Sequence, residues 1–264
     1  MRFAQQNVQR RYMKQEEINK NWSESSTNYD RIIQDELQSF RVEAWQEQIL
    51  SHFDEKSRLK ILDLGCGPAF FSIILSAKGH DVIGIDGAEG MIQRARRNVK
   101  NNNSTAEILE MNAAKLDFPD NSFDLLVCRN VTHTLLDHAG TYTEWKRVLK
   151  PGGKLLIYDA NWHFEFARPD IREQYLRDWK ECIRRFGSDF NENTDPDAIP
   201  EIEEEPEGGH PLLDLVRPDF DYGVLKAIGF SEISFVRDIT ERLWDDKEKL
   251  LYGTTPMFEI CAVK

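Results

Sequence analysis

The sequence predicts an α/β protein with a doubly wound, Rossmann-like parallel sheet. Short apolar runs alternate with helical patterns over residues 59–159, which is typical of parallel strands joined by crossover helices. The first run ends in the turn Gly65-Cys66-Gly67. The second run ends in Asp86, roughly 20 residues after the turn, where dinucleotide-binding folds place an acid.

The strands and helices of this pattern can be assigned in order. Each predicted strand is a short run rich in apolar residues, and each predicted helix has apolar residues three and four positions apart. The stretch LKPGG indicates a helix end followed by a turn. The predicted strands are residues 59–64, 81–85, 106–111, 123–128 and 154–158, and the predicted helices are residues 69–78, 89–100 and 139–149.

The chain after the fifth predicted strand departs from this alternation. Residues 162–216 are a predicted insertion, which begins as an aromatic-rich helical region. Its acidic part, residues 187–211, is either a solvated loop or a mobile flap over a site. A helix closed by Gly229 follows. We expect strands at 233–237 and 257–263 to pair antiparallel in a tight final hairpin.

The N-terminal region, residues 1–52, contains no strand-like run. The stretch YDRIIQDELQSFRVEAWQEQIL places its apolar residues mostly at helical intervals, so we expect one or two helices over the following domain. The predicted organisation is therefore a helical lid, residues 1–54, followed by one main domain, residues 55–264, which carries the insertion.

The composition restricts the class of protein. The 264 residues carry a net charge of −12, which disfavours a nucleic-acid partner because phosphate backbones are also negative. No apolar run approaches the ~18 residues of a membrane span, and the N-terminus lacks the apolar core of a signal peptide. The four cysteines lack zinc-ligand spacing, so we expect reduced thiols, no metal and a cytoplasmic location.

The glycine turn indicates a ligand that approaches the backbone closely. A strand that ends in Gly-x-Gly and leads into a helix offers free backbone N–H groups, and Asp86 suits the hydroxyls of a ribose. A nicotinamide dinucleotide is disfavoured, because Phe70 occupies the third glycine position and the charge of Asp63 would oppose a pyrophosphate. An acid beside the glycines is better suited to a positively charged ligand.

Three stretches together resemble the class I S-adenosylmethionine-dependent methyltransferases, in particular small-molecule enzymes of the ubiquinone/menaquinone type. They are ILDLGCGPAFFSIILSAKGHDVIGIDGAEGMIQRAR, MNAAKLDFPDNSFDLLVCRNVTHTL and EWKRVLKPGGKLLIYDANW, and the match in order and spacing covers roughly residues 59–159. The resemblance implies S-adenosylmethionine as cofactor and S-adenosylhomocysteine as product. It also implies a seven-stranded sheet with an antiparallel last strand, which agrees with the predicted C-terminal hairpin.

The resemblance also implies which residues bind the cofactor. Asp63 and the two glycines would lie along the methionine part, and Asp86 would accept hydrogen bonds from both ribose hydroxyls. Met91 would pack on the adenine. The implied cofactor-binding residues are Tyr29, Asp63, Gly65, Cys66, Gly67, Asp86, Gly87, Met91, Asn112, Ala113, Arg129 and Asn130.

Several of these positions depart from the family pattern or depend on context. Asn112 replaces the usual aspartate near the adenine amino group, which keeps an acceptor oxygen but loses the charge. Arg129 would face the sulfonium region with Asn130, and Tyr29 would lie near the cofactor carboxylate. Ala69 stands where the commonest form has glycine, a change that should be tolerated if the φ of Ala69 is negative.

The catalytic candidates are His133, Asp159 and Asn161, which follow the fourth and fifth predicted strands. Ligands of doubly wound sheets lie beyond the carboxyl ends of the strands. Methyl transfer needs mainly positioning, and it needs a base only if the acceptor must lose a proton. An imidazole can accept a proton near neutral pH, so His133 is the candidate base, unless it is an ordinary hydrogen-bonded histidine. Asp159 and Asn161 are candidates for orienting a substrate amine or hydroxyl.

The predicted function is transfer of a methyl group from S-adenosylmethionine to a small-molecule acceptor. The expected protein is a monomer or homodimer with no nucleic-acid partner and no membrane partner. Two alternatives remain open, which are a methyltransferase that modifies a protein and a non-catalytic protein that binds S-adenosylmethionine.

Overall fold

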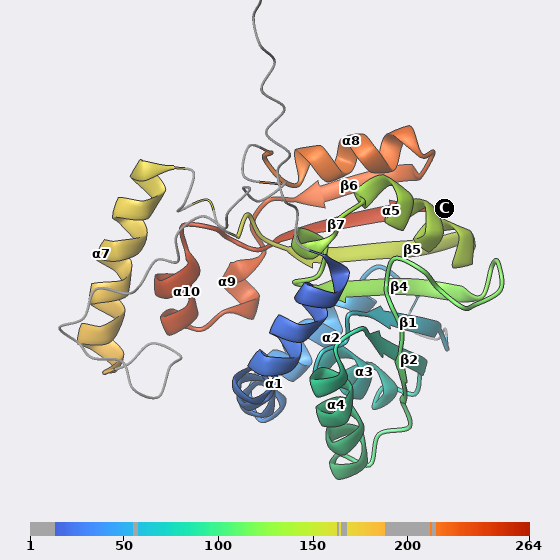
Figure 1. The fold of residues 1–264 in the computed structure, drawn as a ribbon, viewed down its shortest axis with the longest axis horizontal. Helices are drawn as coiled ribbons and strands as arrows, with labels where there is room; N and C mark the ends of the chain where they lie inside the picture. The colour runs from blue at the N-terminus through green and yellow to red at the C-terminus, as the bar shows by residue number, and fades with distance from the viewer. Residues whose placement is uncertain (1–13, 55–57, 163, 165–167, 188–211, 213–214) are drawn as a thin grey trace, which may run out of the picture.

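The computed structural model describes residues 14–54, 58–162, 164, 168–187, 212 and 215–264. Their strands form one seven-stranded sheet with the order β3-β2-β1-β4-β5-β7-β6 (Figure 1). The first five strands are parallel, and β7 is antiparallel to β5 and β6, as predicted. The strands are β1 (Lys60–Leu64), β2 (Asp81–Asp86), β3 (Glu107–Glu110), β4 (Phe123–Arg129), β5 (Leu149–Asp159), β6 (Ser231–Val236) and β7 (Phe258–Val263).

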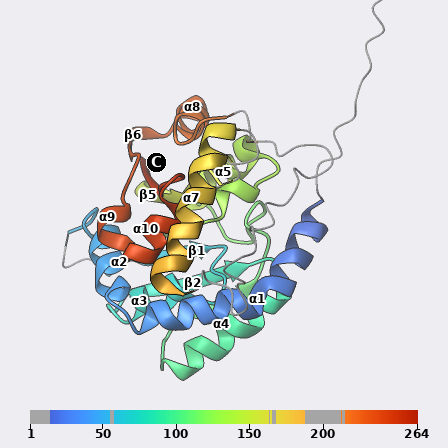
Figure 2. The same ribbon diagram turned by 90° about the vertical axis from the view of Figure 1, so that its left-hand side faces the viewer.

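Helices cover both faces of this sheet. The first four pack on one face, α5 and α8 pack on the other, and α7 lies against α10 at the side of the molecule (Figures 1 and 2). The helices are α1 (Gln15–Leu37), α2 (Arg41–Leu50), α3 (Phe70–Ser76), α4 (Glu89–Asn101), α5 (His138–Val148), α7 (Pro169–Phe186), α8 (Asp219–Ala227), α9 (Thr240–Leu243) and α10 (Asp246–Tyr252), with a 3₁₀ turn, η1 (Thr132–Thr134).

Side chains of the sheet alternate between two hydrophobic cores, as a strand period of two requires. Ile61 faces Trp45 of α2 and Phe71 of α3, whereas the next residue, Leu62, faces Trp145 of α5. The rings of Trp45 and Phe71 meet edge to face, with centroids 5.0 Å apart. Because α2 supplies a buried tryptophan to this core, the second half of the predicted lid region packs directly against the sheet.

Two details of the predicted strand pattern are wrong. β6 and β7 pair, but α9 and α10 lie between them in the chain, so they do not form a tight hairpin. The signal for α10 is a capping box, in which Asp245 accepts from the Glu248 backbone and Glu248 accepts from the Asp245 backbone. In addition, β5 begins at Leu149, because the LKPGG stretch forms an irregularity within the strand.

The condition under which an alanine at position 69 would be tolerated without cost, a negative φ, is not met. Ala69 precedes α3 with φ 75° and ψ 34°, which is the left-handed region. The turn that follows β1 requires this conformation from whichever residue stands there. A residue with a Cβ atom adopts it at a cost of roughly 1–2 kcal/mol, which explains why glycine is common at this position.

Helix α7 is the described part of the predicted helical insertion. It begins at Pro169 and ends at Phe186, and the next residue, Gly187, has a φ of 75° that suits a helix C-cap. Its apolar face, which includes Trp179 and Ile183, packs against Leu251 of α10. The rest of the acidic segment, residues 188–211, lies outside the described residues. Among those described, no helix is both long and apolar enough to cross a membrane.

Candidate functional site

Two adjoining cavities lie at the carboxyl ends of the central strands, next to the point where the strand order reverses between β1 and β4. Their volumes, including the open space at their mouths, are about 690 Å³ and about 280 Å³. Tyr29, Gly65 and Arg129 border both. The larger cavity is also lined by Gln15, Ile18, Asn19, Trp22, Gly67, Asp86, Gly87, Met91, Asn112, Ala113, Asn130, Val131, Thr134 and Leu135. The smaller is also lined by Ile33, Asp63, Cys66, Phe70 and Phe71. Every residue predicted to bind the cofactor therefore borders one cavity or the other.

The glycine turn has the tight backbone that its sequence suggests. Gly65 has φ 63° and Gly67 has φ 51°, values that residues with a side chain rarely adopt. A Cβ atom on Gly65 would lie 2.5 Å from Cγ2 of Val131, so the loop after β4 could not approach the turn. The Cys66 amide donates to the Ile85 carbonyl at 2.8 Å, which ties the turn to β2.

Asp86 connects the turn to the start of α4. Its Oδ2 accepts from the Gly67 amide at 3.0 Å, and its Oδ1 accepts from the Ala88 amide at 2.8 Å. Burial raises the pKa of the carboxyl, although these backbone donors act in the opposite direction. Each carboxylate oxygen can accept more than one hydrogen bond. Asp86 can therefore hold the turn and still accept from a ligand in the larger cavity.

Asp63 is the buried acid of the smaller cavity. Its side chain accepts a 2.6 Å hydrogen bond from Ser72 Oγ, and the residue is only 2% exposed. Burial raises its pKa to about 6, against the opposing effects of Ser72 and Arg129. A positively charged ligand at this position would stabilise the ionised form of Asp63.

Arg129 borders both cavities and is paired with an acid from α1. Its guanidinium donates to both oxygens of Glu36, at 3.1 and 2.8 Å. It also lies over Phe70 and Phe71, 4.9 and 5.2 Å from the ring centroids. Burial alone would lower the pKa of Arg129, but the Glu36 carboxylate raises it above its usual range. Arg129 therefore stays charged in an apolar setting because Glu36 compensates it.

Tyr29 and Asn130 are neighbours on the wall of the larger cavity. Burial raises the pKa of Tyr29, while a hydrogen bond from the Asn130 side chain opposes this. Asn130 adopts a left-handed backbone with φ 57°. Its Oδ1 is buried and has no hydrogen-bond partner among the described residues. An unpaired buried acceptor beside a cavity indicates a ligand that donates a hydrogen bond there.

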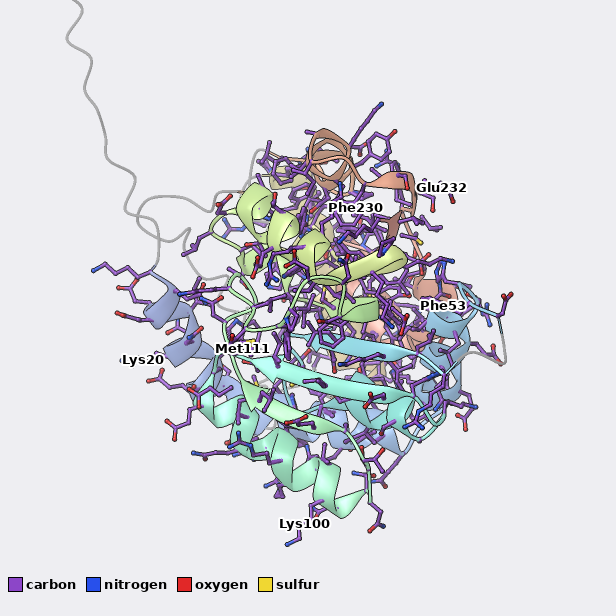
Figure 3. The ribbon with its side chains drawn as sticks, turned by 90° about the vertical axis from the view of Figure 1, so that its right-hand side faces the viewer. Lys20, Phe53, Lys100, Met111, Phe230 and Glu232 are labelled. Carbon is purple, nitrogen blue, oxygen red and sulfur yellow. The ribbon has the colours of Figure 1, made fainter. Side chains whose placement is uncertain are left out.

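Four further residues, on successive turns of α1, also face the larger cavity. The sequence analysis did not assign them to the site. Gln15, Ile18, Asn19 and Trp22 follow the helical spacing of three, four and seven, which is the signal that could have identified them. Gln15 donates to Asn19 Oδ1 at 2.9 Å. On its outer side α1 presents Lys20 to solvent, as α4 presents Lys100 (Figure 3).

Asn112 and Ala113 border the larger cavity after β3. The Asn112 Oδ1 accepts from the Ala114 amide at 2.8 Å, so the side chain stabilises its own loop. Asn112 is exposed, and its amide nitrogen remains available as a donor. In the predicted contact with an adenine amino group, the Asn112 oxygen would accept two hydrogen bonds, one from the adenine and one from the Ala114 amide.

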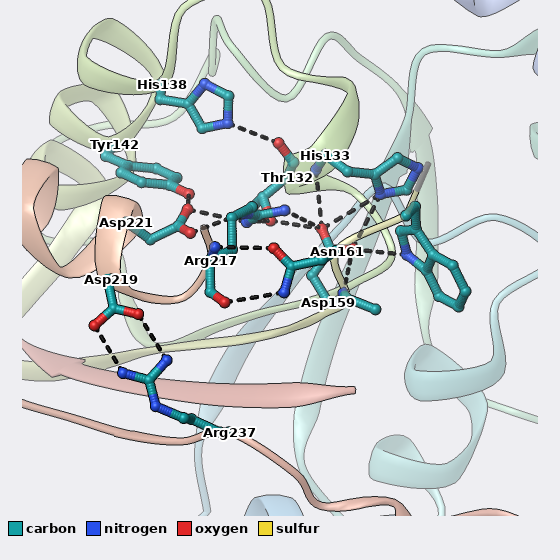
Figure 4. Close-up of polar contacts among 12 residues, drawn as sticks. Thr132, His133, His138, Tyr142, Asp159, Asn161, Arg217, Asp219, Asp221 and Arg237 are labelled. Atoms are coloured by element: carbon teal, nitrogen blue, oxygen red, sulfur yellow. Dashed lines mark hydrogen bonds and ion pairs between the residues drawn. The ribbon is translucent and has the colours of Figure 1, made fainter. Parts of the chain in front are cut away.

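The catalytic candidates lie outside the two cavities, in a buried polar network at the ends of β4 and β5 (Figure 4). Asp159 accepts from Thr132 Oγ1 at 2.6 Å and from the His133 amide at 2.9 Å. Its Oδ1 lies 3.1 Å from Nδ1 of His133. Burial alone would raise the pKa of Asp159, but His133 and Arg217 hold it well below its usual range. Asp159 thus orients the imidazole of His133.

The Asn161 side chain makes two hydrogen bonds to the backbone of Arg217. Its Oδ1 accepts from the Arg217 amide at 2.9 Å, and its Nδ2 donates to the Arg217 carbonyl at 3.0 Å. Both polar groups of the Asn161 side chain are therefore engaged (Figure 4). Its predicted contact with a substrate stays a prediction.

Arg217 is a central member of this network that the sequence analysis missed. Its guanidinium donates to Asp221 at 2.7 and 2.9 Å, bonds Thr132 and lies 3.2 Å from Asp159. Tyr142 donates to the same Asp221 at 2.5 Å. Arg217 is separated from Asp159 by the whole insertion, so no local pattern pointed to it. The network holds Thr132 in place between the cavity-lining residues Val131 and Thr134.

Nowhere in the described part of the chain do His, Cys, Asp and Glu side chains form a group that could hold a metal ion.

Comparisons with known proteins identify the family to which the chain belongs. A family described as "Methyltransferase domain" matches residues 62–157. The demethylmenaquinone methyltransferase of Staphylococcus saprophyticus is 30% identical over 186 residues, which cover 69% of this chain and 77% of that protein. The enzyme of the same name from Listeria welshimeri is 29% identical over 186 residues, with coverage of 64% and 78%. Among solved structures, a SAM-dependent methyltransferase from Methanosarcina mazei has a TM-score of 0.55 and 25% identity, and the match covers 82% of this chain and 96% of that chain.

The sheet topology, the glycine turn and the acid after β2 define a Rossmann-like enzyme of the nucleoside-cofactor type. The chain belongs to the class I S-adenosylmethionine-dependent methyltransferases, in the small-molecule group that includes the demethylmenaquinone methyltransferases. The predicted class, its enzymatic activity and its cofactor are thereby confirmed.

Proposed function

We propose that the cofactor spans both cavities, with its adenosine part in the larger one and its methionine part in the smaller one. Asp86 then meets the ribose hydroxyls, and Met91 packs on the adenine ring. Asp63 meets the ammonium group of the methionine part, and Arg129 meets its carboxylate. The unpaired Asn130 Oδ1 supplies a further acceptor for an N–H donor.

The same arrangement suits the charge of the cofactor. S-adenosylmethionine supplies a methyl group on a positively charged sulfonium. Asp63 and Asp86 are acids on the cavity walls, and Arg129, the one arginine among the described wall residues, is paired with Glu36. A negative surplus around a cavity attracts a cation more strongly than it does in water.

The acceptor class that these cavities favour is a small apolar ring of the quinol type. The observation that carries this proposal is the apolar part of the larger cavity's wall, which Ile18, Trp22, Val131 and Leu135 form. Aromatic and aliphatic side chains of this kind hold flat rings by contact area. The names of the Staphylococcus and Listeria relatives, demethylmenaquinone methyltransferases, support the same class.

In the proposed step, an electron pair on the acceptor forms the new bond to the methyl carbon, and the carbon–sulfur bond breaks with its pair left on sulfur. The acceptor then carries one proton too many and must release it. His133 is the proposed base, because Asp159 fixes the orientation of its ring and the neighbouring Val131 and Thr134 line the larger cavity. Since the ring itself borders neither cavity, the proton would reach it through one bridging water. Asp159 and Asn161 are proposed positioning residues.

The acceptor can be tested directly with cofactor that carries an isotope-labelled methyl group. Purified protein is incubated with a demethylated naphthoquinol that has a shortened isoprenoid chain, and in parallel with a total metabolite extract. We expect the label on the quinol ring by mass spectrometry, and no label with the Asp86→Ala variant. Label on a polar amine, or on a peptide in the extract, would overturn the quinol proposal and favour the class of the labelled product.

A further inference from the structure

The ion pair between Glu36 and Arg129 joins the end of α1 to the end of β4. Both side chains are only 10% exposed, so water screens the pair weakly. The pairing is bidentate, and Arg129 is also packed on aromatic rings, so its position is well defined. Glu36 itself does not border either cavity. Its influence on a ligand must therefore act through Arg129 and through its own charge.

The charges around this pair are close enough to influence one another. Tyr29, which borders both cavities, experiences the fields of Arg129, Glu36 and Asp86. Asp63 experiences the fields of Arg129 and Asp86. Arg129 also feels Glu248, which is itself paired with Arg41. With Glu36 present, three acids face the single charge of Arg129, and without Glu36 only Asp63 and Asp86 do, so the negative surplus falls from two charges to one.

We propose that Glu36 is a specificity-determining residue, which makes the site prefer the positively charged cofactor over its neutral product. The inference rests on the proposed cofactor position. S-adenosylmethionine and S-adenosylhomocysteine share the adenosine, the ammonium group and the carboxylate, and differ by one methyl group and one positive charge. The negative charge of Glu36 therefore attracts S-adenosylmethionine and has little effect on the binding of S-adenosylhomocysteine. After transfer the attraction is lost, which favours release of the product.

The test is calorimetric titration of wild type and Glu36→Gln with both compounds. A glutamine keeps a hydrogen-bond acceptor for Arg129 but removes the charge. In Glu36→Gln, S-adenosylmethionine should lose about tenfold more affinity than S-adenosylhomocysteine does. This estimate applies to charges about 10 Å apart in a medium of effective dielectric about 20. An analogue with an amine in place of the sulfonium should behave like the cofactor. Under turnover, the variant should be inhibited more strongly by added product.

Two further variants separate charge from structure. Glu36→Asp keeps the charge, so the affinity ratio should return most of the way to the wild-type value. Glu47→Gln makes the same charge change at an exposed position on α2 and should leave the ratio unchanged. Equal weakening of both compounds by Glu36→Gln would overturn the inference and give Glu36 a purely structural role. Failure of wild type to bind either compound would instead overturn the proposed cofactor position.

Discussion

The Arg217 guanidinium lies 3.2 Å from the Asp159 carboxylate, at the point where the chain returns to the sheet after the insertion. Both side chains are almost completely buried. Arg217 also pairs with Asp221, and Asp159 also contacts His133. A single arginine thus compensates two buried acids and connects the end of β5 to α8.

Replacing Arg217 should destabilise the protein strongly. Arg217→Met leaves Asp159 and Asp221 buried without their partner, and removal of one member of a buried ion pair typically costs roughly 3–5 kcal/mol. Arg217→Lys keeps the charge but loses the forked geometry, so a smaller loss is expected. Urea unfolding at neutral pH measures both. A loss below about 1 kcal/mol for Arg217→Met would contradict the role assigned to this network.

His133→Ala tests the proposed base. If the imidazole takes the acceptor proton, kcat should fall by roughly 10²–10⁴-fold. Affinity for S-adenosylmethionine should change by less than about threefold, because the ring borders neither cavity. His138→Gln is the matched control, since His138 is a second buried histidine, which bonds the Thr132 carbonyl at 2.8 Å. Near-normal kcat in His133→Ala would leave His133 as a structural residue.

Asp86→Ala should weaken binding of S-adenosylmethionine at least tenfold. Two charge-assisted hydrogen bonds to the ribose are lost, each worth roughly 1.5–3 kcal/mol. The substitution also frees the Gly67 and Ala88 amides, so the melting temperature must be measured beside the calorimetric affinity. Asp86→Asn retains one acceptor oxygen and should bind with intermediate affinity. Unchanged affinity in a folded Asp86→Ala protein would remove Asp86 from the proposed site.

Affinity for S-adenosylmethionine should decrease as the pH is lowered through about 6. Burial raises the pKa of Asp63 to about 6, so this carboxylate is ionised above that pH and protonated below it. A cationic ligand binds the ionised form better, so the dissociation constant should rise about tenfold between pH 7 and pH 5. Asp63→Asn should bind weakly at pH 7 and lack this change. If Asp63→Asn shows the same pH dependence of affinity as wild type, a group other than Asp63 is responsible for it.

Removal of residues 1–22 tests the lid proposal. The deletion takes away Gln15, Ile18, Asn19 and Trp22 from the cavity wall, but leaves Asp30, which Arg94 and Asn98 hold on α4. Figure 2 shows α1 and α4 side by side along this contact. We expect a folded protein with cofactor affinity reduced at least tenfold. Global unfolding of the truncated chain, seen by circular dichroism, would show that the segment belongs to the core.

The sequence by itself determined the central sheet and the part of the site closest to it. Apolar runs, a Gly-x-Gly turn and Asp86 are local signals, and the parallel arrangement then brings the strand ends to one edge. That is why the sequence alone assigns Gly65, Asp86 and Asn130 to one site. The helical spacing of the α1 residues was also visible in the sequence, although only Tyr29 of that helix was assigned to the site.

Only the tertiary structure decided which distant charges meet. Glu36 pairs with Arg129 across 93 positions, and Thr132 bonds Arg217 across 85. Neither pair has a local pattern, because long-range ion pairs depend on how helices dock on the sheet. The positive φ of Ala69 was likewise decided by the turn it occupies rather than by its own preference. Local propensity favours a negative φ for alanine by roughly 1–2 kcal/mol, and the packing of β1 against α3 outweighs that preference.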